Sequence, residues 1–219
     1  MLGHKHMNNV NQYLLENLPT QNEWVLKLEK EAKEHRVPIM DPVSMNYVMQ
    51  LIRLAQPQSI LEIGTAIGYS ALRMQQAAPR SKITTIEKNE QMYERAFTNI
   101  KDMNHHNKIE IIYGDAMSEL TKLTLLERTY DFIFIDAAKG KYKQFFELVQ
   151  PLISNKGVIV CDNVLFRGYV AHKGKAEQKR LEKLAEKLRL FNEWLSYHQE
   201  YDTSIVPIGD GISISIKKD

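Results

Sequence analysis

Two stretches, Phe132–Asp136 (FIFID) and Val158–Asn163 (VIVCDN), decide the fold of this 219-residue chain. Each is an apolar run rich in β-branched residues, and each ends in side chains that carry hard oxygen ligands. Such runs are typical of strands that are buried on both faces of a parallel sheet. Ligands of open α/β sheets bind beyond the carboxyl ends of the strands. Two neighbouring strands would therefore bring Asp136, Asp162 and Asn163 to one crevice.

This trio of side chains favours a metal site. Two carboxylates and one amide oxygen suit a hard divalent cation such as Mg²⁺, which also keeps several waters. Aspartates that follow strands also commonly cap the next helix, so Asp136 and Asp162 have a second interpretation. The pattern by itself leaves both interpretations open.

Strands and helices alternate from residue 59 onward, which predicts a parallel, doubly wound α/β sheet. The expected strands are residues 59–63, 82–87, 108–113, 130–135 and 157–161, and the expected helices are residues 69–78, 90–103, 116–126 and 142–150. A charged helix should follow at residues 176–196. Two closing strands, 204–207 and 212–217, flank Gly209-Asp210-Gly211, and that short connection predicts an antiparallel hairpin.

The first quarter of the chain, residues 8–56, reads as helices only. Thr20 or Asn22 begins one helix, and Pro38 ends it. Asp41-Pro42 opens the next, with proline at an early position where its missing N–H costs little. We therefore expect a single domain over residues 1–219, with a helical N-terminal extension at 1–56 and a Rossmann-like core at 57–219.

Composition limits the classes of function. Hydrophobic residues make up 43% of the chain, which supports a sizeable core, and a net charge of +2 argues against a surface coated with nucleic acid. The chain has no apolar run long enough to span a membrane and no signal-peptide pattern at residues 1–6, so we expect no membrane partner. The single cysteine, Cys161, excludes an intramolecular disulfide and fits the reducing cytoplasm.

The turn after the first expected strand, Gly64–Ser70 (GTAIGYS), suits a nucleotide-type ligand. Its two glycines allow a tight turn and close approach of the backbone, but Ala66 breaks the G-x-G-x-x-G pattern of dinucleotide enzymes. Glu87 ends the second strand, where an acid can accept hydrogen bonds from two ribose hydroxyls. Gly114–Ala116 ends the third strand and offers small residues and a carboxylate beside an adenine. Together these features favour S-adenosylmethionine over NAD.

Each of these features also has a simpler interpretation. A tight strand-to-helix turn needs glycine whatever it binds. Glu62, on the first strand, could be a solvated acid, and Glu87 could cap the following helix. Only their joint occurrence on three consecutive strands points to the cofactor.

The same segments resemble a known family, the cation-dependent O-methyltransferases, which includes the catechol and caffeoyl-CoA O-methyltransferases. The matching segments are Leu61–Ser70, Ile86–Glu87, Gly114–Ala116, Ile135–Lys139, Asp162–Leu165 and Pro207–Gly211. The resemblance extends from about Val37 to the C-terminus. It implies a Rossmann-like, S-adenosylmethionine-dependent methyltransferase fold with seven strands, mostly parallel, and an antiparallel C-terminal hairpin. It also implies a homodimer, because relatives of this type are commonly homodimers.

The resemblance assigns roles to individual residues. It implies that Asp136, Asp162 and Asn163 hold Mg²⁺, and that Lys139 is the general base of a catalytic pair with Asp136. The residues implied to bind S-adenosylmethionine are Met40, Glu62, Gly64, Ser70, Glu87, Asp115, Ala116 and Asp136. Ala138 stands where the family usually has a second acid, so one polar contact of the family is missing. Without the family, Lys139 could equally be a solvated lysine at the start of a helix.

Three segments, Val37–Met40, Ile135–Gly140 and Asp162–Gly168, further resemble the bacterial tRNA 5-hydroxyuridine methyltransferases. That resemblance implies that the substrate is the wobble uridine in the anticodon of tRNA and that the product is 5-methoxyuridine. Basic residues downstream of the metal trio would then contact phosphates. These are Arg167, Lys173, Lys175, Lys179 and Arg180.

Other interpretations remain for this part of the chain. The basic stretch could be a solvated helix face with Glu–Lys pairs such as Glu182–Lys183. Phe166 and Tyr169 could stack on a base or pack in the core. The substrate could be a small catechol or phenol. A non-catalytic S-adenosylmethionine- or RNA-binding module is a third interpretation, but binding alone needs no metal trio with Lys139.

Overall fold

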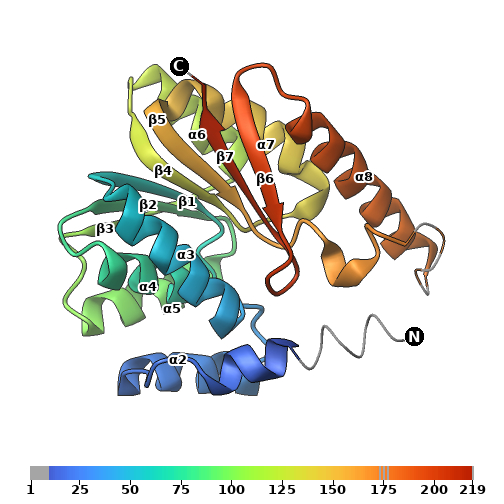
Figure 1. Ribbon diagram of the computed structural model, residues 1–219. Coiled ribbons are helices and arrows are strands. Elements are labelled where there is room, and N and C mark those ends of the chain that lie inside the picture. The colour runs from blue at the N-terminus through green and yellow to red at the C-terminus, as the bar shows by residue number, and fades with distance from the viewer. Residues whose placement is uncertain (1–9, 173, 175, 177, 219) are drawn as a thin grey trace.

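A computed structural model of the protein describes residues 10–172, 174, 176 and 178–218. Its centre is a seven-stranded sheet with the order β3-β2-β1-β4-β5-β7-β6 (Figure 1). The strands are β1 (Ser59–Ile63), β2 (Lys82–Glu87), β3 (Ile109–Tyr113), β4 (Tyr130–Ile135), β5 (Ile153–Cys161), β6 (Tyr201–Val206) and β7 (Ile212–Lys217). The first five strands pair in parallel, and β7 pairs antiparallel with both β5 and β6. This topology confirms the predicted fold class.

Helices cover both faces of the sheet (Figure 1). The α-helices are α2 (Glu23–Glu34), α3 (Pro42–Ala55), α4 (Tyr69–Ala77), α5 (Glu90–Asp102), α6 (Ala116–Leu125), α7 (Tyr142–Val149) and α8 (Lys179–Ser196). The short 3-10 helices are η1 (Lys139–Lys141), η2 (Gln150–Leu152) and η3 (Phe166–Gly168), and residues 10–16 are also helical. In one hydrophobic core, helices α2, α3, α4 and α5 pack against one face of the sheet. In a second core, helices α6, α7 and α8 pack against the other face.

Most predicted boundaries agree with the structure to within a residue or two, but three elements begin elsewhere. Strand β5 begins at Ile153, four residues before the predicted start, because Ile153 still pairs with Tyr130 across an irregularity in the ladder. Strand β6 begins at Tyr201, whose side chain is buried. Helix α8 begins at Lys179 rather than at residue 176. None of the helices among the described residues is long and apolar enough to cross a membrane.

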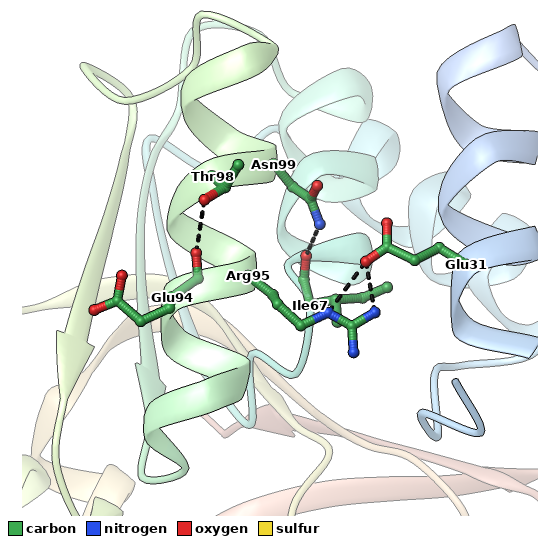
Figure 2. Close-up of polar contacts among 6 residues, drawn as sticks. All are labelled: Glu31, Ile67, Glu94, Arg95, Thr98 and Asn99. Atoms are coloured by element: carbon green, nitrogen blue, oxygen red, sulfur yellow. Dashed lines mark hydrogen bonds and ion pairs between the residues drawn. The ribbon is translucent and has the colours of Figure 1, made fainter. Parts of the chain in front are cut away.

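The N-terminal helices are attached to the core by polar as well as apolar contacts. Figure 2 shows Glu31 of α2 facing Arg95 of α5, with an N–O distance of 2.5 Å. On the same helix, Asn99 Nδ2 donates to the carbonyl oxygen of Ile67 at 3.0 Å (Figure 2). The hydroxyl of Tyr69 donates to Glu29 at 2.8 Å. These contacts hold the turn between β1 and α4 in place, and that turn borders the site described next.

Candidate active site

A cavity of about 310 Å³ lies at the carboxyl ends of the parallel strands, near the lower limit for small-molecule sites. The predicted site residues that line it come from the ends of all five parallel strands and from the segment before α3. They are Met40, Gly64, Ser70, Glu87, Asp115, Ala116, Asp136, Lys139, Asp162 and Asn163. The strand order explains this convergence, because β1, β4 and β5 are adjacent and all end at this edge. Of the residues predicted to bind the cofactor, only Glu62 does not line the cavity.

The turn after β1 needs glycine at its first position. Gly64 has a φ of +102°, and a Cβ there would lie 2.1 Å from the carbonyl oxygen of Asp136. Ala66 also has a positive φ, and its N–H donates to Glu87 Oε2 at 2.9 Å. The second Glu87 oxygen accepts the N–H of Asn89 at 2.8 Å. The carboxylate of Glu87 is therefore fixed in the cavity wall, while Asn89, and not Glu87, is the cap of α5.

Glu62 lies behind this wall and has no exposed surface. The Thr85 hydroxyl donates to its Oε2 at 2.6 Å, whereas its Oε1 has no hydrogen-bond partner. Burial raises the pKa of Glu62 to about 7, although hydrogen bonds from Ser70 and Thr85 oppose the shift. The interpretation of Glu62 as a solvated acid is therefore wrong. Its partner Thr85 also hydrogen-bonds with Thr65, a residue of the cavity lining, and this links Glu62 to that lining.

Asp136 and Asp162 form an acidic pair whose negative charge is only weakly balanced by neighbouring groups. Asp162 is 1% exposed, and its carboxylate accepts the backbone N–H and the side-chain amide of Asn163, at 2.7 and 3.0 Å. Burial raises the pKa of both aspartates, the charge of Asp136 raises that of Asp162 further, and Lys139 opposes the shift. Neither aspartate is the N-cap of the helix that follows, so the capping interpretation is wrong for both. Asp115, by contrast, does cap α6 through Oδ1.

This pair suits a cation. Two desolvated carboxylates that repel each other carry an excess of negative charge, which a dication would neutralise. Asn163 has a φ of +56°, a conformation that asparagine tolerates, and it adds an amide group beside the pair. All three side chains offer the hard oxygen atoms that Mg²⁺ prefers. The described residues contain no group of three or more His, Cys, Asp and Glu side chains that could hold a metal, so a third protein ligand at this site would have to be of another type, such as Asn163.

Several supporting residues were not predicted. The Tyr142 hydroxyl donates to the carbonyl oxygen of Asp162 at 2.9 Å, and Asn192 Nδ2 donates to that of Val164 at 2.9 Å. The carbonyl oxygen of Asp210 accepts the N–H of Leu165 at 2.8 Å. These bonds join α7, α8 and the β6–β7 turn to the segment that carries the candidate metal ligands. The Thr65 hydroxyl, which also lines the cavity, hydrogen-bonds with that of Thr85 at 2.6 Å.

The basic residues predicted to bind RNA are distributed along the next segment. Arg167 is exposed in η3, Lys179 is exposed at the start of α8, and Arg180 lines a second groove beside the cavity. The predicted Lys173 and Lys175 lie outside the described residues. The expected pair between Glu182 and Lys183 is absent from the described ion pairs. Glu182 instead contacts Arg189 at 2.6 Å, because residues seven apart share a helix face and adjacent residues do not.

The aromatic residues of this segment pack mainly on the core. Phe166 is 9% exposed, and its ring meets that of Tyr169 edge-to-face, with 5.6 Å between centroids. Both belong to or pack against the core that α7 and α8 share. This arrangement favours the core-packing interpretation over stacking on a base.

Comparisons with known proteins agree with this geometry. A family model described as O-methyltransferase matches residues 16–218. Caffeoyl-CoA O-methyltransferase 1 of Arabidopsis thaliana is 29% identical over 225 residues, covering 97% of this chain and 87% of that protein. A solved structure from Staphylococcus aureus, described provisionally as a caffeoyl-CoA O-methyltransferase, has a TM-score of 0.85 and 35% identity over the full length of both chains. The SAH-bound methyltransferase PaMTH1 from Podospora anserina has a TM-score of 0.86 and 25% identity, covering 98% of this chain and 96% of its own. The chain therefore belongs to the O-methyltransferase family.

Proposed function

We propose that the protein is an S-adenosylmethionine- and Mg²⁺-dependent O-methyltransferase that converts 5-hydroxyuridine at the wobble position of tRNA to 5-methoxyuridine. One observation carries the methyltransferase part of the proposal, and the tRNA part rests on the resemblance of residues 37–40, 135–140 and 162–168. One cavity is lined by Glu87 and Asp115 at the β2 and β3 ends and by Asp136, Lys139 and Asp162 at the β4 and β5 ends. Residues suited to a nucleoside and a pair of acids with a lysine thus border one space of small-molecule size.

Residues of the β1, β2 and β3 ends would bind S-adenosylmethionine, the donor of the methyl group. Each oxygen of Glu87 accepts one backbone hydrogen bond and keeps capacity for another, which suits a ribose diol. Ser70 and Gly64 would contact the methionine part, and the buried Glu62 lies behind this wall. Met40, which is 3% exposed and lines the cavity, would exclude water. The SAH-bound relative PaMTH1 supports this choice of cofactor.

Residues of the β4 and β5 ends would prepare the acceptor. Asp136, Asp162 and Asn163 would hold Mg²⁺, which supplies Lewis acidity to an acceptor hydroxyl bound beside it. Lys139, at the start of η1, would take the hydroxyl proton on Nζ. Asp162 is kept in position by the Tyr142 hydroxyl, so the acceptor oxygen would meet a fixed array of groups. An acceptor with two adjacent oxygens, such as 5-hydroxyuracil or a catechol, fits this arrangement.

The alternative acceptor is a small catechol or phenol. The names of the curated relatives support it at least as well as the resemblance of the loop segments supports tRNA, because those relatives are caffeoyl-CoA and flavonoid methyltransferases. The core packing of Phe166 also removes one expected base contact. The identity of the acceptor therefore has to be measured directly.

The test is methyl transfer from labelled S-adenosylmethionine to tRNA that carries 5-hydroxyuridine, with a catechol and caffeoyl-CoA in parallel, each with Mg²⁺ and with EDTA. We expect label in the tRNA, with Mg²⁺ only. Label in the phenolic acceptors alone would overturn the tRNA assignment in favour of the alternative. Equal transfer in EDTA would overturn the metal assignment. Asp131→Asn is the matched control, since Asp131 lies outside the cavity at the start of the strand that Asp136 follows.

A further inference from the structure

A second groove adjoins the cavity and differs from it in charge. Its lining residues come from η1, η3 and α8. They are Lys139, Phe166, Arg180, Leu181, Lys183, Leu184 and Lys187. Lys139 lines both the groove and the cavity, so the two spaces lie on either side of one residue. Every ionisable side chain that lines the groove is a cation.

The cations that α8 contributes to the groove have no acidic partner among the residues that the structure describes. Among the described residues, Arg180, Lys183 and Lys187 make no ion pair or side-chain hydrogen bond. Two acids lie among them in sequence, Glu182 and Glu186. Glu182 is occupied by Arg189 at 2.6 Å and by the N–H of Ala176 at 3.3 Å, and Glu186 does not line the groove. Some lysines on other helices find partners, as Lys122 does with Glu119 on α6 at 2.7 Å. Others among the described residues, such as Lys101 on α5, also lack an ion pair, but this face places three such cations beside one groove.

The three cations are held on one rigid face. Residues 180, 183 and 187 are three and four positions apart, so they lie in one row along α8. Leu181 and Leu184 provide apolar surface beside them. A Cβ placed on Gly140 would lie 3.7 Å from Leu184 Cδ1 and 3.9 Å from Lys187 Nζ. The ammonium group of Lys187 therefore lies over the residue that follows Lys139.

The two spaces offer different chemistry. The cavity contains Asp136 and Asp162, whose charge the proposed cation would balance, and the α8 row gives the groove an excess of positive charge. An acceptor with a neutral hydroxyl-bearing ring and an anionic group beyond it would match both spaces.

We propose that this groove binds a phosphate group of the methyl acceptor, with Lys183, Lys187 and Arg180 contacting the phosphate while the reacting hydroxyl lies in the cavity. The proposal rests on the proposed function for the position of that hydroxyl. The shared chemistry is a phosphate ester, which two sources can supply. One is the phosphodiester next to a nucleoside in RNA, and the other is a phosphate of a coenzyme A thioester.

The test compares acceptors that differ only in their phosphates. An anticodon stem-loop with 5-hydroxyuridine is paired with the free nucleoside 5-hydroxyuridine, and caffeoyl-CoA is paired with caffeic acid. The variant is the double substitution Lys183→Ala with Lys187→Ala, and Lys101→Ala, an exposed lysine on α5, is the matched control. Replacing both lysines by arginine should restore binding because the charge remains.

We expect the double alanine variant to raise KM for the phosphate-bearing acceptor about tenfold and to leave kcat unchanged. KM for the phosphate-free member of the pair should stay the same. If the stem-loop is the acceptor, the slope of log KM against log salt should also fall by about 2, for two lost contacts. The pair of acceptors that shows this difference identifies the source of the phosphate.

Two results would overturn the proposal. One is an equal change in KM for both members of a pair, and the other is no change for the phosphate-bearing member. If neither acceptor is methylated, the proposed function fails, but direct binding still tests whether the groove binds phosphate. Fluorescently labelled stem-loop and coenzyme A would then be titrated into the wild-type protein and the double variant. If each ligand bound both proteins with equal affinity, the groove would not be a phosphate site.

Discussion

Asp131 and Asp136 lie at opposite ends of one strand, β4, and their carboxyl groups have opposite surroundings. At the start of the strand, Asp131 accepts the backbone N–H groups of Gln58 and Ser59, at 2.8 and 3.1 Å, and the Ser154 hydroxyl at 2.8 Å. Burial raises the pKa of Asp131, but these hydrogen bonds outweigh it, and the net pKa lies below the ordinary value. Just past the other end, burial raises the pKa of Asp136, and the charge of Lys139 opposes it.

The difference separates an acid that serves the fold from acids that serve a ligand. Asp131 connects the starts of β1, β4 and β5, and the protein itself balances its charge. Asp136 and Asp162 are desolvated and repel each other, so their charge has to be balanced from outside. Strongly shifted acids of this kind gather at functional sites. Substitutions at the two ends of the strand should therefore separate activity from stability.

The largest effect should come from Asp162→Asn. We expect methyl transfer to fall by about 10³-fold, because a ligand of the proposed cation and its negative charge are lost. The melting temperature at pH 8 should hold or rise, because a buried, repelled charge is removed and the new amide oxygen can still accept the N–H of Asn163. Labelled methyl transfer and thermal unfolding of the same preparation check both expectations. If the variant lost activity only because it unfolds, Asp162 would serve the fold, as Asp131 does, rather than a ligand.

Glu62→Gln extends the comparison to the wall behind the cofactor region. The folded pKa of Glu62, about 7, lies above the ordinary value of 4.5, so the folded protein holds this proton more tightly than the unfolded chain. Stability from this group is complete below pH 4.5 and is lost as the pH rises through 7. Glutamine stays neutral, so the variant should gain up to about 3 kcal/mol of unfolding free energy at pH 8 relative to wild type.

Denaturant unfolding of the ligand-free protein from pH 4 to pH 8 measures that gain. The wild-type curve should decline over this interval and the variant curve should be flatter. The affinity for S-adenosylmethionine should fall in the variant, because the Thr85 hydroxyl loses its bond to a carboxylate and Thr85 in turn bonds with Thr65 of the cavity lining. Parallel pH curves for the two proteins would mean that Glu62 is not the group that titrates.

Local patterns made the strand ends predictable. The FIFID and VIVCDN runs mark buried parallel strands by composition alone, and the edge at which such strands bind ligands follows from the fold. The burial of Glu62 also follows once β1 is known to be central, because both of its faces are covered. The sequence alone leaves a solvated Glu62 open as an alternative, since an acid in a strand is more often exposed.

Contacts between distant segments were not predictable. Tyr142 supports Asp162 from 20 residues away, and Asn192 supports Val164 from 28 residues away. Both depend on how α7 and α8 pack on the sheet, which no periodicity in the sequence encodes. The polar network around Asp131 is of the same kind, because its partner Gln58 is 73 residues away. Long-range hydrogen bonds of single side chains carry no local signal.

The smallest effect should come from Asp131→Asn. Unlike Asp162→Asn, this variant should lose stability and keep its methyl-transfer activity. Asparagine loses the charge that strengthens the bonds from Gln58, Ser59 and Ser154, so we expect a loss of about 1–2 kcal/mol in unfolding free energy at pH 7. The folded pKa of Asp131 lies below the ordinary value of 3.8, so its contribution is present above that pH and disappears as the pH falls further. Denaturant unfolding at pH 7 and at pH 3 should show a stability difference between variant and wild type at pH 7 that shrinks at pH 3. Methyl transfer per folded molecule should match the wild type, because Asp131 does not line the cavity. If this variant lost transfer as Asp162→Asn does, an acid of β4 would matter to catalysis wherever it lies, and the division between the two ends of the strand would not hold.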